Sequence, residues 1–202
     1  MFAGIVSHLG KLKKKEKSHF IFEADESFCK KLHESTSVAV NGICLTIDEK
    51  PTKNTFAISI MPETLRRTMF GELQEGAVVN LELPVTAETL ISGHFVQGHI
   101  DGTGRVLAIK EEGNSQIITI GIPEKLSNSI VEKGAVALNG ISLTVIKEAT
   151  TYFTVGIIPY TWEHTMLHNL KYGDLVNIEL DVLVKYIDKI LKSRGLDQIK
   201  TK

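Results

Sequence analysis

An internal duplication constrains the fold of this 202-residue chain more than any other feature of its sequence. The segment SVAVNGICLTI at residues 37–47 returns as AVALNGISLTV at residues 135–145. The segment that begins at Phe56 returns from Phe153, and the opening MFAGIVSHLGKL matches FVQGHIDGTGRV from Phe95. The three matches are collinear. We therefore interpret the chain as a tandem duplication of a unit of about 95 residues, followed by a tail from Asp181.

Each unit has the sequence pattern of a β structure. The runs SVAVNG, CLTI, TFAISI and VVNLEL are short, rich in Val, Ile and Thr, and bounded by Gly, Asn, Pro and Lys. Asn-Gly pairs at 41–42 and 139–140 predict tight hairpins between apolar runs. Pro62 and Pro159 open segments that predict one short helical turn per unit. Six short strands with one such turn predict a small closed barrel, because closure removes exposed sheet edges.

The tail predicts a helix of a different kind. Asp181 can cap its start, Leu183 and Ile187 follow at helical spacing, and Gly195 can end it. Such a helix would be apolar on nearly all faces, so we expect it to pack against other chains. The predicted segments are a first barrel at 1–94, a second barrel at 95–180, and a helix with its tail at 181–202.

Charge and cysteine content exclude several classes of protein. Lys and Arg number 23 against 24 Asp and Glu, so the strongly basic surface of a nucleic-acid-binding protein is absent. The run KLKKKEK at 11–17 is therefore expected to be a solvated hairpin loop. No membrane-spanning run or signal peptide is recognisable, and Cys29 and Cys44 lack the spacing of a zinc site. We expect a cytoplasmic protein with reduced cysteines, no metal, no nucleic-acid partner and no membrane partner.

Six motifs in a fixed order resemble one enzyme family. MFAGIV, NGICLTI, MPETLRRT, SGHFVQGHIDGTG, NGISLTV and IPYTWEHT, between Met1 and about Leu191, resemble riboflavin synthases of the two-repeat, lumazine-binding type. The resemblance implies an all-β fold of two tandem six-stranded antiparallel Greek-key barrels plus a C-terminal α-helix. It also implies a homotrimer held by those helices, with active sites between subunits. Association with a lumazine synthase shell stays open.

The activity that this resemblance implies is a transferase reaction, the last step of riboflavin biosynthesis. Two molecules of 6,7-dimethyl-8-ribityllumazine exchange a four-carbon unit, which gives riboflavin and 5-amino-6-ribitylaminouracil without a cofactor. The duplication suits this chemistry, because two copies of one binding barrel can present two identical substrates to each other with near two-fold symmetry. Much of the rate can then come from orientation.

Donor and acceptor need different chemistry, so positions where the repeats differ are candidates for catalysis. Cys44 stands opposite Ser142, Ser37 opposite Ala135, and His99 opposite Ile5. By resemblance, Cys44 and Ser37 lie in the N-terminal site, where they could add to or polarise C7 of the acceptor. The alternative for Cys44 is a small buried hydrophobic residue.

His99 is a candidate acid or base because imidazole titrates near neutrality, the alternative being a histidine bonded into a barrel corner. The nearby His94 is expected to be structural. Ser142 and Thr144 complete the predicted catalytic set.

Substrate binding requires hydrogen-bond donors for the ring anion and polar contacts for the ribityl chain. Backbone N–H groups and hydroxyls are expected to serve the ring from Gly4, Ile5, Val6, Cys44, Leu45, Thr46, Gly98, His99, Ile100, Ser142, Leu143 and Thr144. The ribityl chain is expected to contact Ser59, Ile60, Met61, Pro62, Glu63, Thr64, Ile158, Pro159, Tyr160, Thr161, Trp162 and Glu163. Lys133 resembles a family lysine that reaches the neighbouring subunit's site, and its alternative is a solvated surface lysine.

Other function classes are less consistent with the sequence. A non-catalytic lumazine- or flavin-binding optical protein would tend to lose reactive residues in one barrel. A flavin-binding reductase domain would lack the duplication and would need a nicotinamide-binding partner domain with a glycine-rich turn, which is absent. A nucleic-acid module would need basic and aromatic residues interleaved, and KLKKKEK lacks the aromatic ones.

Overall fold

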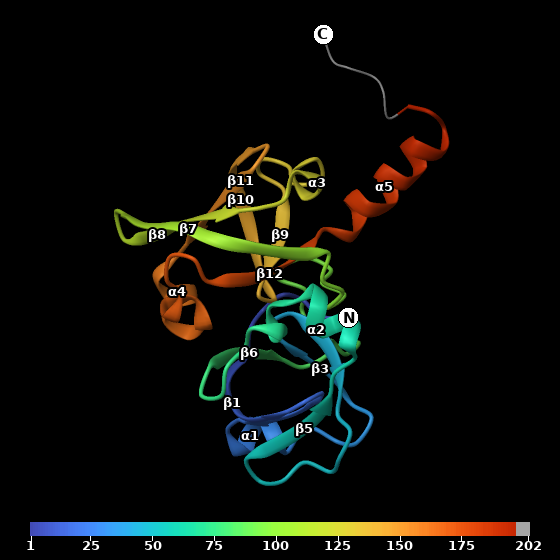
Figure 1. Cartoon of the computed structure of the whole chain (residues 1–202), viewed down its shortest axis with the longest axis vertical. Coiled ribbons are helices and arrows are strands. Elements are labelled where there is room, and N and C mark those ends of the chain that lie inside the picture. Colours follow the sequence, from blue (N-terminus) through green and yellow to red (C-terminus); the bar gives the residue numbers. More distant parts are fainter. Residues whose placement is uncertain (197–202) are drawn as a thin grey trace.

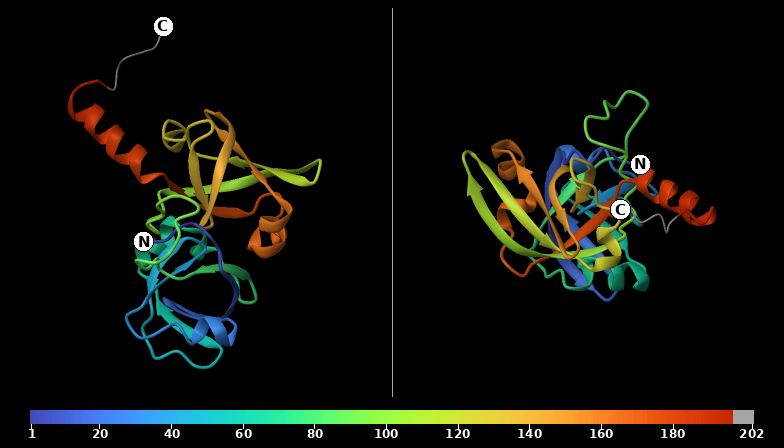
Figure 2. Two further views of the ribbon diagram at one scale, coloured as in Figure 1. Left: turned by 180° about the vertical axis from the view of Figure 1, so that it is seen from behind. Right: turned by 90° about the horizontal axis from the view of Figure 1, so that it is seen from above.

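The structure is a computed structural model that describes residues 1–196. Two β-barrels are stacked along the long axis, and a single helix projects away from both of them (Figure 1, Figure 2). Residues 197–202 of the expected helix and tail lie outside the described residues. Within residues 1–196, no helix combines the length and apolar character that a membrane crossing requires.

The N-terminal barrel is a six-stranded antiparallel sheet in the order β4-β3-β6-β1-β2-β5. Its strands are β1 (His8–Glu16), β2 (His19–Glu23), β3 (Ser37–Val40), β4 (Ile43–Thr46), β5 (Thr55–Ser59) and β6 (Val78–Glu82). Its helical segments are α1 (Glu26–Cys29), α2 (Pro62–Arg67) and η1 (Met69–Gly71). Between the end strands, a loop bond joins the Asp48 N–H to the Ala57 carbonyl at 3.2 Å, so this barrel is nearly closed.

The C-terminal barrel repeats this plan and is fully closed, in the order β10-β11-β8-β7-β12-β9. Its strands are β7 (Gly102–Glu112), β8 (Ser115–Gly121), β9 (Ala135–Leu138), β10 (Ile141–Ala149), β11 (Tyr152–Ile157) and β12 (Leu175–Leu180). Its helical segments are α3 (Glu124–Ser127), α4 (Pro159–His164) and η2 (Met166–Asn169). The barrel closes because β10 runs on to Ala149 and pairs with β11, whereas β4 ends at Thr46.

These elements confirm the predicted pair of six-stranded antiparallel barrels. Both predicted Asn-Gly hairpins form, and Asn41 and Gly42 adopt φ values of 45° and 77°, as a tight hairpin between twisted strands requires. Pro62 and Pro159 begin α2 and α4 as expected. Each barrel contains two further helical segments that the pattern did not predict. One of them, α1, is capped by Asp25, whose Oδ1 accepts from the Phe28 N–H at 2.9 Å.

The expected solvated loop at residues 11–17 is wrong, because this basic run lies in strand β1 as far as Glu16. Leu12 is fully buried, while the neighbouring lysines point outward along the pleat. Lys15 folds over the end of η1, where its Nζ donates to the carbonyls of Phe70, Gly71 and Leu73 at 3.3, 3.1 and 3.1 Å. Charge along a strand thus marks its outer face rather than its end.

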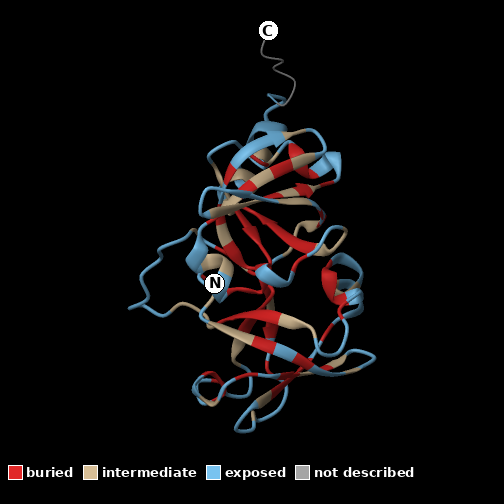
Figure 3. Ribbon diagram, turned by 90° about the vertical axis from the view of Figure 1, so that its left-hand side faces the viewer, coloured by how far each residue is buried: buried red, intermediate tan, exposed pale blue. Residues whose placement is uncertain are grey.

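Each barrel has its own core (Figure 3). The N-terminal core is aromatic. The ring centroid of Phe22 lies 5.5 Å from that of Phe56 and 6.0 Å from that of Phe70, and all three residues are at most 2% exposed. The C-terminal core is mainly aliphatic, with Ile118 and Val155 fully buried at its centre. Burial of one such side chain contributes about 1.5–3 kcal/mol, so each repeat contains enough apolar surface for a core of its own.

Four asparagines join the barrels across a pseudo-two-fold axis. The Asn80 Nδ2 donates to the Asn139 carbonyl and the Asn177 Nδ2 donates to the Asn41 carbonyl, both at 2.9 Å. The Oδ1 of Asn80 accepts from the Met166 N–H, and that of Asn177 accepts from the Met69 N–H, both at 2.8 Å. All four asparagines are at most 2% exposed. The joint is therefore polar, buried and fully bonded at these groups.

The two Asn-Gly turns meet on this axis. A Cβ at Gly42 would lie 2.5 Å from the Gly140 backbone nitrogen, and a Cβ at Gly140 would lie 2.7 Å from that of Gly42. Both glycines also have positive φ. No residue with a side chain fits either position without moving one barrel from the other.

The projecting helix α5 (Val182–Ser193) confirms the predicted C-terminal helix. The Asp181 Oδ1 accepts from the Leu183 N–H at 2.9 Å and caps its start. Lys185 anchors the first turn to the C-terminal barrel, with its Nζ 2.7 Å from the Asp101 Oδ2. Large apolar side chains on this helix are exposed in the monomer: Leu183, Tyr186, Ile187, Ile190 and Leu191.

Candidate functional site

Two short segments cross between the barrels, and each completes the opposite one. We name residues 1–6 the first arm and residues 95–100 the second arm. The arms pair with each other through Phe2 and Val96, whose N–H groups donate to each other's carbonyls at 2.7 and 3.1 Å. Beyond this bridge the arms diverge. The Gly4 carbonyl accepts from the Ser142 N–H at 2.8 Å, and the Gly98 carbonyl accepts from the Cys44 N–H at 2.9 Å.

Glycine is required where each arm meets the opposite barrel. Gly4 and Gly98 have φ values of +72° and +81°. A Cβ at Gly98 would lie 2.5 Å from the Cys44 Cβ, and a Cβ at Gly4 would lie 2.7 Å from the Ser142 Cβ. The arms therefore lie directly against the two predicted reactive residues.

A buried carboxylate holds each arm from its own barrel. Glu82 on β6 accepts from the N–H groups of Ala3 and Gly4 at 2.7 and 3.1 Å. Glu179 on β12 accepts from three N–H groups, those of residues 97–99. Burial raises the pKa of Glu82 to about 7, although the backbone donors and the N-terminal amine oppose the shift. Burial also raises the pKa of Glu179, against the same kind of donors and Lys185.

These bonds correct one part of the expectation for substrate binding. The backbone N–H groups of Gly4, Gly98 and His99 already donate to buried carboxylates. Those of Cys44 and Ser142 already donate to the arms. The expectation that these five groups stabilise a ligand anion is wrong, because their hydrogen bonds are made within the protein.

A pocket of about 360 Å³ lies where the second arm meets the N-terminal barrel. It brings seven predicted residues together from both halves of the chain: Cys44, Met61, Glu63, Thr64, Gly98, His99 and Ile100. Three residues that the sequence reasoning missed also line it, Ile43, Arg67 and Thr68. The Arg67 Nε lies 3.0 Å from the Glu63 Oε1. Arg67 could have been found from the sequence, because opposite charges four residues apart on a predicted helical turn indicate an ion pair.

Other predicted residues of the N-terminal half lie beside this pocket or beneath it. Ser37 pairs with Thr46 in the β3–β4 ladder, and alternation places both on the same face as Cys44. Leu45 and Ile60 point into the barrel core instead. Ser59 and Pro62 are exposed at the end of β5 and the start of α2.

The corresponding site of the C-terminal half contains a serine–histidine pair. The His94 Nδ1 lies 2.7 Å from the Ser142 Oγ, a contact that the sequence did not predict for this expected structural histidine. Burial lowers the pKa of His94, while Asp181 opposes the shift. Within residues 1–196, its buried Nε2 has no hydrogen-bond partner. A neutral imidazole beside a hydroxyl can accept or donate one proton.

The α4 helix differs from α2 at the two positions that form the Glu63–Arg67 ion pair in α2. The Tyr160 ring stacks on His164 with centroids 4.1 Å apart, where α2 has the Glu63–Arg67 ion pair. Trp162 packs against the barrel core. Among the other predicted residues of this face, Leu143 is buried. The rest are exposed or half-buried: Ile5, Val6, Thr144, Ile158, Pro159, Thr161 and Glu163.

Lys133 is exposed in the turn before β9, with φ of 64° and its N–H bonded to the Val145 carbonyl at 2.8 Å. Within the described residues, no group of three or more His, Cys, Asp or Glu side chains is arranged to hold a metal ion.

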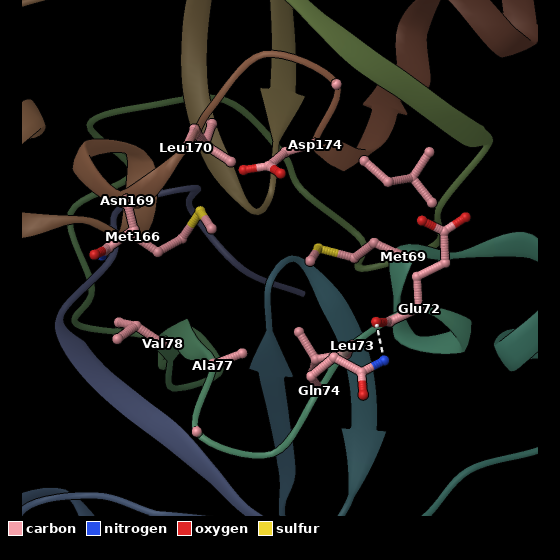
Figure 4. Close-up of a pocket in the computed structure, with 13 residues that line it drawn as sticks. Met69, Glu72, Leu73, Gln74, Ala77, Val78, Met166, Asn169, Leu170 and Asp174 are labelled. Atoms are coloured by element: carbon pink, nitrogen blue, oxygen red, sulfur yellow. Dashed lines mark hydrogen bonds between the residues drawn. The ribbon is translucent and has the colours of Figure 1, made fainter.

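Another cavity, of about 420 Å³, lies between the barrels on the pseudo-two-fold axis. Met69 and Met166 point their sulfur atoms into it from the two repeats (Figure 4). Leu73 and Leu170 line it as a further repeat-related pair. None of the reactive residues predicted from the sequence reaches this cavity.

Comparisons with known proteins agree with this architecture. The family model described as lumazine binding domain matches twice, at residues 3–84 and 97–181. A riboflavin synthase of Actinobacillus pleuropneumoniae is 39% identical over 204 residues, covering 100% of this chain and 94% of the relative. That of Bacillus subtilis is 35% identical over 194 residues, covering 95% and 90%.

Among solved structures, LumP complexed with 6,7-dimethyl-8-(1'-D-ribityl) lumazine has a TM-score of 0.78 at 26% identity, covering 89% of this chain and 99% of LumP. LumP complexed with riboflavin has a TM-score of 0.79 with the same coverage. The duplicated barrels, the paired sites and these relatives together establish that the chain belongs to the riboflavin synthase family.

Proposed function

We propose that this chain converts two molecules of 6,7-dimethyl-8-ribityllumazine into riboflavin and 5-amino-6-ribitylaminouracil by transfer of a four-carbon unit. The observation that carries the proposal is the pair of symmetry-related sites with different reactive groups. One site combines Cys44 with His99 of the second arm, and the other combines Ser142 with His94. Equivalent positions can bind the same substrate, while unlike side chains can assign it donor and acceptor roles.

In the N-terminal site, His99 can move the proton that the reaction requires, since histidine is the side chain that most often serves as a general acid or base. Cys44 adds to or polarises C7 of the bound ring, with Ser37 and Thr46 on the same face of the sheet. Arg67 also lines this pocket as an ion pair with Glu63, and the pair can offer both a hydrogen-bond donor and an acceptor to the bound ligand.

In the C-terminal site, Ser142 is poised for proton exchange with His94 at 2.7 Å. The Thr144 hydroxyl lies two residues along the same strand and therefore on the same face. Residues 59–64 and 158–163, at the start of α2 and α4, are expected to contact the ribityl chain. The binding units correspond to residues 1–94 and 95–180, with their arms exchanged.

A homotrimer completes this proposal. Two rings must meet face to face, and we infer from the family resemblance that the N-terminal site of one subunit faces the C-terminal site of another. The exposed Leu183, Ile187 and Ile190 of α5 give the subunits an apolar surface to share. Lys133 is exposed before β9, and by the same resemblance we propose that it reaches the neighbouring subunit's site. We further propose a cytoplasmic enzyme that uses no cofactor; association with lumazine synthase stays a prediction from the resemblance.

A second candidate function is ligand binding without turnover. The observation that favours it is the similarity to LumP, whose solved structures contain a lumazine, riboflavin or flavin mononucleotide. The retained Cys44, His99 and Ser142 favour catalysis instead.

The two functions separate when binding and product are measured on the same samples. We expect the wild-type protein to bind 6,7-dimethyl-8-ribityllumazine by fluorescence titration and to release riboflavin. His99→Ala should bind with similar affinity and lose about 100-fold in rate, as expected for a general acid or base. Binding by the wild type with no riboflavin would support the second candidate and overturn the first.

A further inference from the structure

We propose that Glu179 is a positioning residue for the reaction, because it fixes the second arm so that His99 lies in the pocket with Cys44. The inference deepens the proposed function and rests on it. Glu179 lies on β12 of the C-terminal barrel, whereas the pocket belongs to the N-terminal barrel. Its action on the chemistry is therefore indirect, through the arm.

Both oxygens of the Glu179 carboxylate accept hydrogen bonds from the arm. Its Oε1 accepts from the Gln97 N–H at 2.6 Å, and its Oε2 accepts from the N–H groups of Gly98 and His99 at 2.8 and 3.1 Å. The residue is 1% exposed. Burial of a carboxylate is costly unless its oxygens are satisfied, and bonds to a charged acceptor are among the stronger ones in proteins. Glu179 therefore holds three consecutive residues of the arm.

The arm is also held on its other side. The Gly98 carbonyl accepts from the Cys44 N–H at 2.9 Å, so one residue links Glu179 to the reactive thiol position. Within residues 1–196, the His99 imidazole makes no hydrogen bond or ion pair of its own. The backbone of the arm therefore sets the point from which the His99 side chain reaches into the pocket, and Glu179 holds that backbone.

The other repeat offers a matched comparison. Glu82 holds the first arm through the N–H groups of Ala3 and Gly4, which both donate to the same oxygen, Oε1, at 2.7 and 3.1 Å. The first arm has Ile5 where the second has His99. Loss of Glu82 therefore displaces no histidine of the first arm.

The charged surroundings of the two carboxylates also differ. Lys185 and Asp101 face Glu179, and they form an ion pair with each other at 2.7 Å. The N-terminal amine faces Glu82. Glu179 is thus the carboxylate whose loss should affect the proton chemistry of the N-terminal site.

Glu179→Gln is the direct test. The amide has a single carbonyl oxygen, so it must give up either the bond from Gln97 or the two bonds from Gly98 and His99. We expect kcat to fall about 100-fold, as a misplacement near 1 Å does in other enzymes, while KM changes less than about 3-fold. We also expect the Cys44 amide to exchange its hydrogen at least about 10-fold faster, because its acceptor on the arm is no longer held.

Glu82→Gln is the matched control for the exchange measurement. Its single oxygen can keep both bonds, so the Cys44 and Ser142 amides should exchange at wild-type rates. In Glu179→Gln, the Ser142 amide should also stay protected, which separates release of one arm from general unfolding. If Glu179→Gln does not fold, Glu179→Asp, which keeps the charge but is shorter by one CH₂, should show the same selective effect at Cys44.

Wild-type kcat in Glu179→Gln, or an unchanged Cys44 exchange rate, overturns the proposal. Equal acceleration at Cys44 and Ser142 overturns it as well, because it would show a general structural role. If the wild-type protein makes no riboflavin, the proposed function fails, whereas the exchange result still reports whether Glu179 holds the arm.

Discussion

Removal of one asparagine from the joint between the barrels should cost far more stability than its size suggests. The perturbation is Asn80→Ala. It deletes the donor to the Asn139 carbonyl at 2.9 Å and the acceptor for the Met166 N–H at 2.8 Å. Asn80 is 2% exposed, so water does not replace these partners without local opening.

The magnitude follows from the two groups that are left behind. An unsatisfied buried donor or acceptor costs about 1–3 kcal/mol, so the two together cost about 4 kcal/mol. That is a large share of the roughly 5–15 kcal/mol by which proteins of ordinary stability are folded. Asn177→Ala should cost a similar amount, because it removes the equivalent bonds to Asn41 and Met69.

Urea unfolding followed by tryptophan fluorescence and circular dichroism measures this loss. Protein concentration must be held fixed, since association would otherwise shift the midpoint. Asn128→Ala is the matched control, because Asn128 is exposed and its loss should change stability by less than about 0.5 kcal/mol. A loss below about 1 kcal/mol in Asn80→Ala would refute the view that this network holds the barrels together.

Three further predictions concern the arm, the helix and the first carboxylate. Gly98→Ala should lower kcat at least about 10-fold, because the new Cβ would lie 2.5 Å from the Cys44 Cβ. Gly113 also has positive φ but faces open space, so Gly113→Ala should keep the wild-type rate. Equal kcat values for the two variants in steady-state assays would contradict this. Ile187→Glu should dissociate the proposed trimer in sedimentation velocity, because it places a charge on the exposed apolar face of α5; a persistent trimer would assign assembly to another surface. Burial raises the pKa of Glu82 from its ordinary value of 4.5 to about 7, so the folded protein keeps a proton that the unfolded chain releases. The stabilisation that protonated Glu82 contributes to the folded state is therefore present below about pH 4.5 and is lost as the pH rises through 7. This changes the free energy of unfolding by about 3 kcal/mol, and Glu82→Gln should remove the change. Identical pH dependence of urea unfolding in the wild type and the variant would disprove this prediction.

Much of the architecture could be predicted because repeated local signals agree with the global fold. The Asn-Gly pairs at 41–42 and 139–140, the prolines at 62 and 159, and the cap at Asp181 each specify a turn or helix start on their own. The Asn-Gly pairs recur 98 residues apart and the prolines 97 residues apart, which implies two copies of one unit. The basic run at 11–17 misled because strand alternation was hidden by lysines on successive positions.

The composition of the site was less predictable, for a physical reason. Repeat equivalence matches Gly4 with Gly98, but it carries no information on which barrel each arm joins. The exchange depends on tertiary contacts, the bonds from Ser142 to Gly4 and from Cys44 to Gly98. Pairing of His94 with Ser142 was missed for the same cause, since their 48-residue separation gives no periodic signal.

The central claim is that the two sites act on two copies of one substrate. Its most direct test is the stoichiometry of the reaction with 6,7-dimethyl-8-ribityllumazine as the only added compound. We expect two molecules of lumazine to disappear for each riboflavin formed, with one 5-amino-6-ribitylaminouracil as the second product, quantified by chromatography. Consumption of one lumazine per riboflavin, or formation of riboflavin only after another carbon donor is added, would contradict the account.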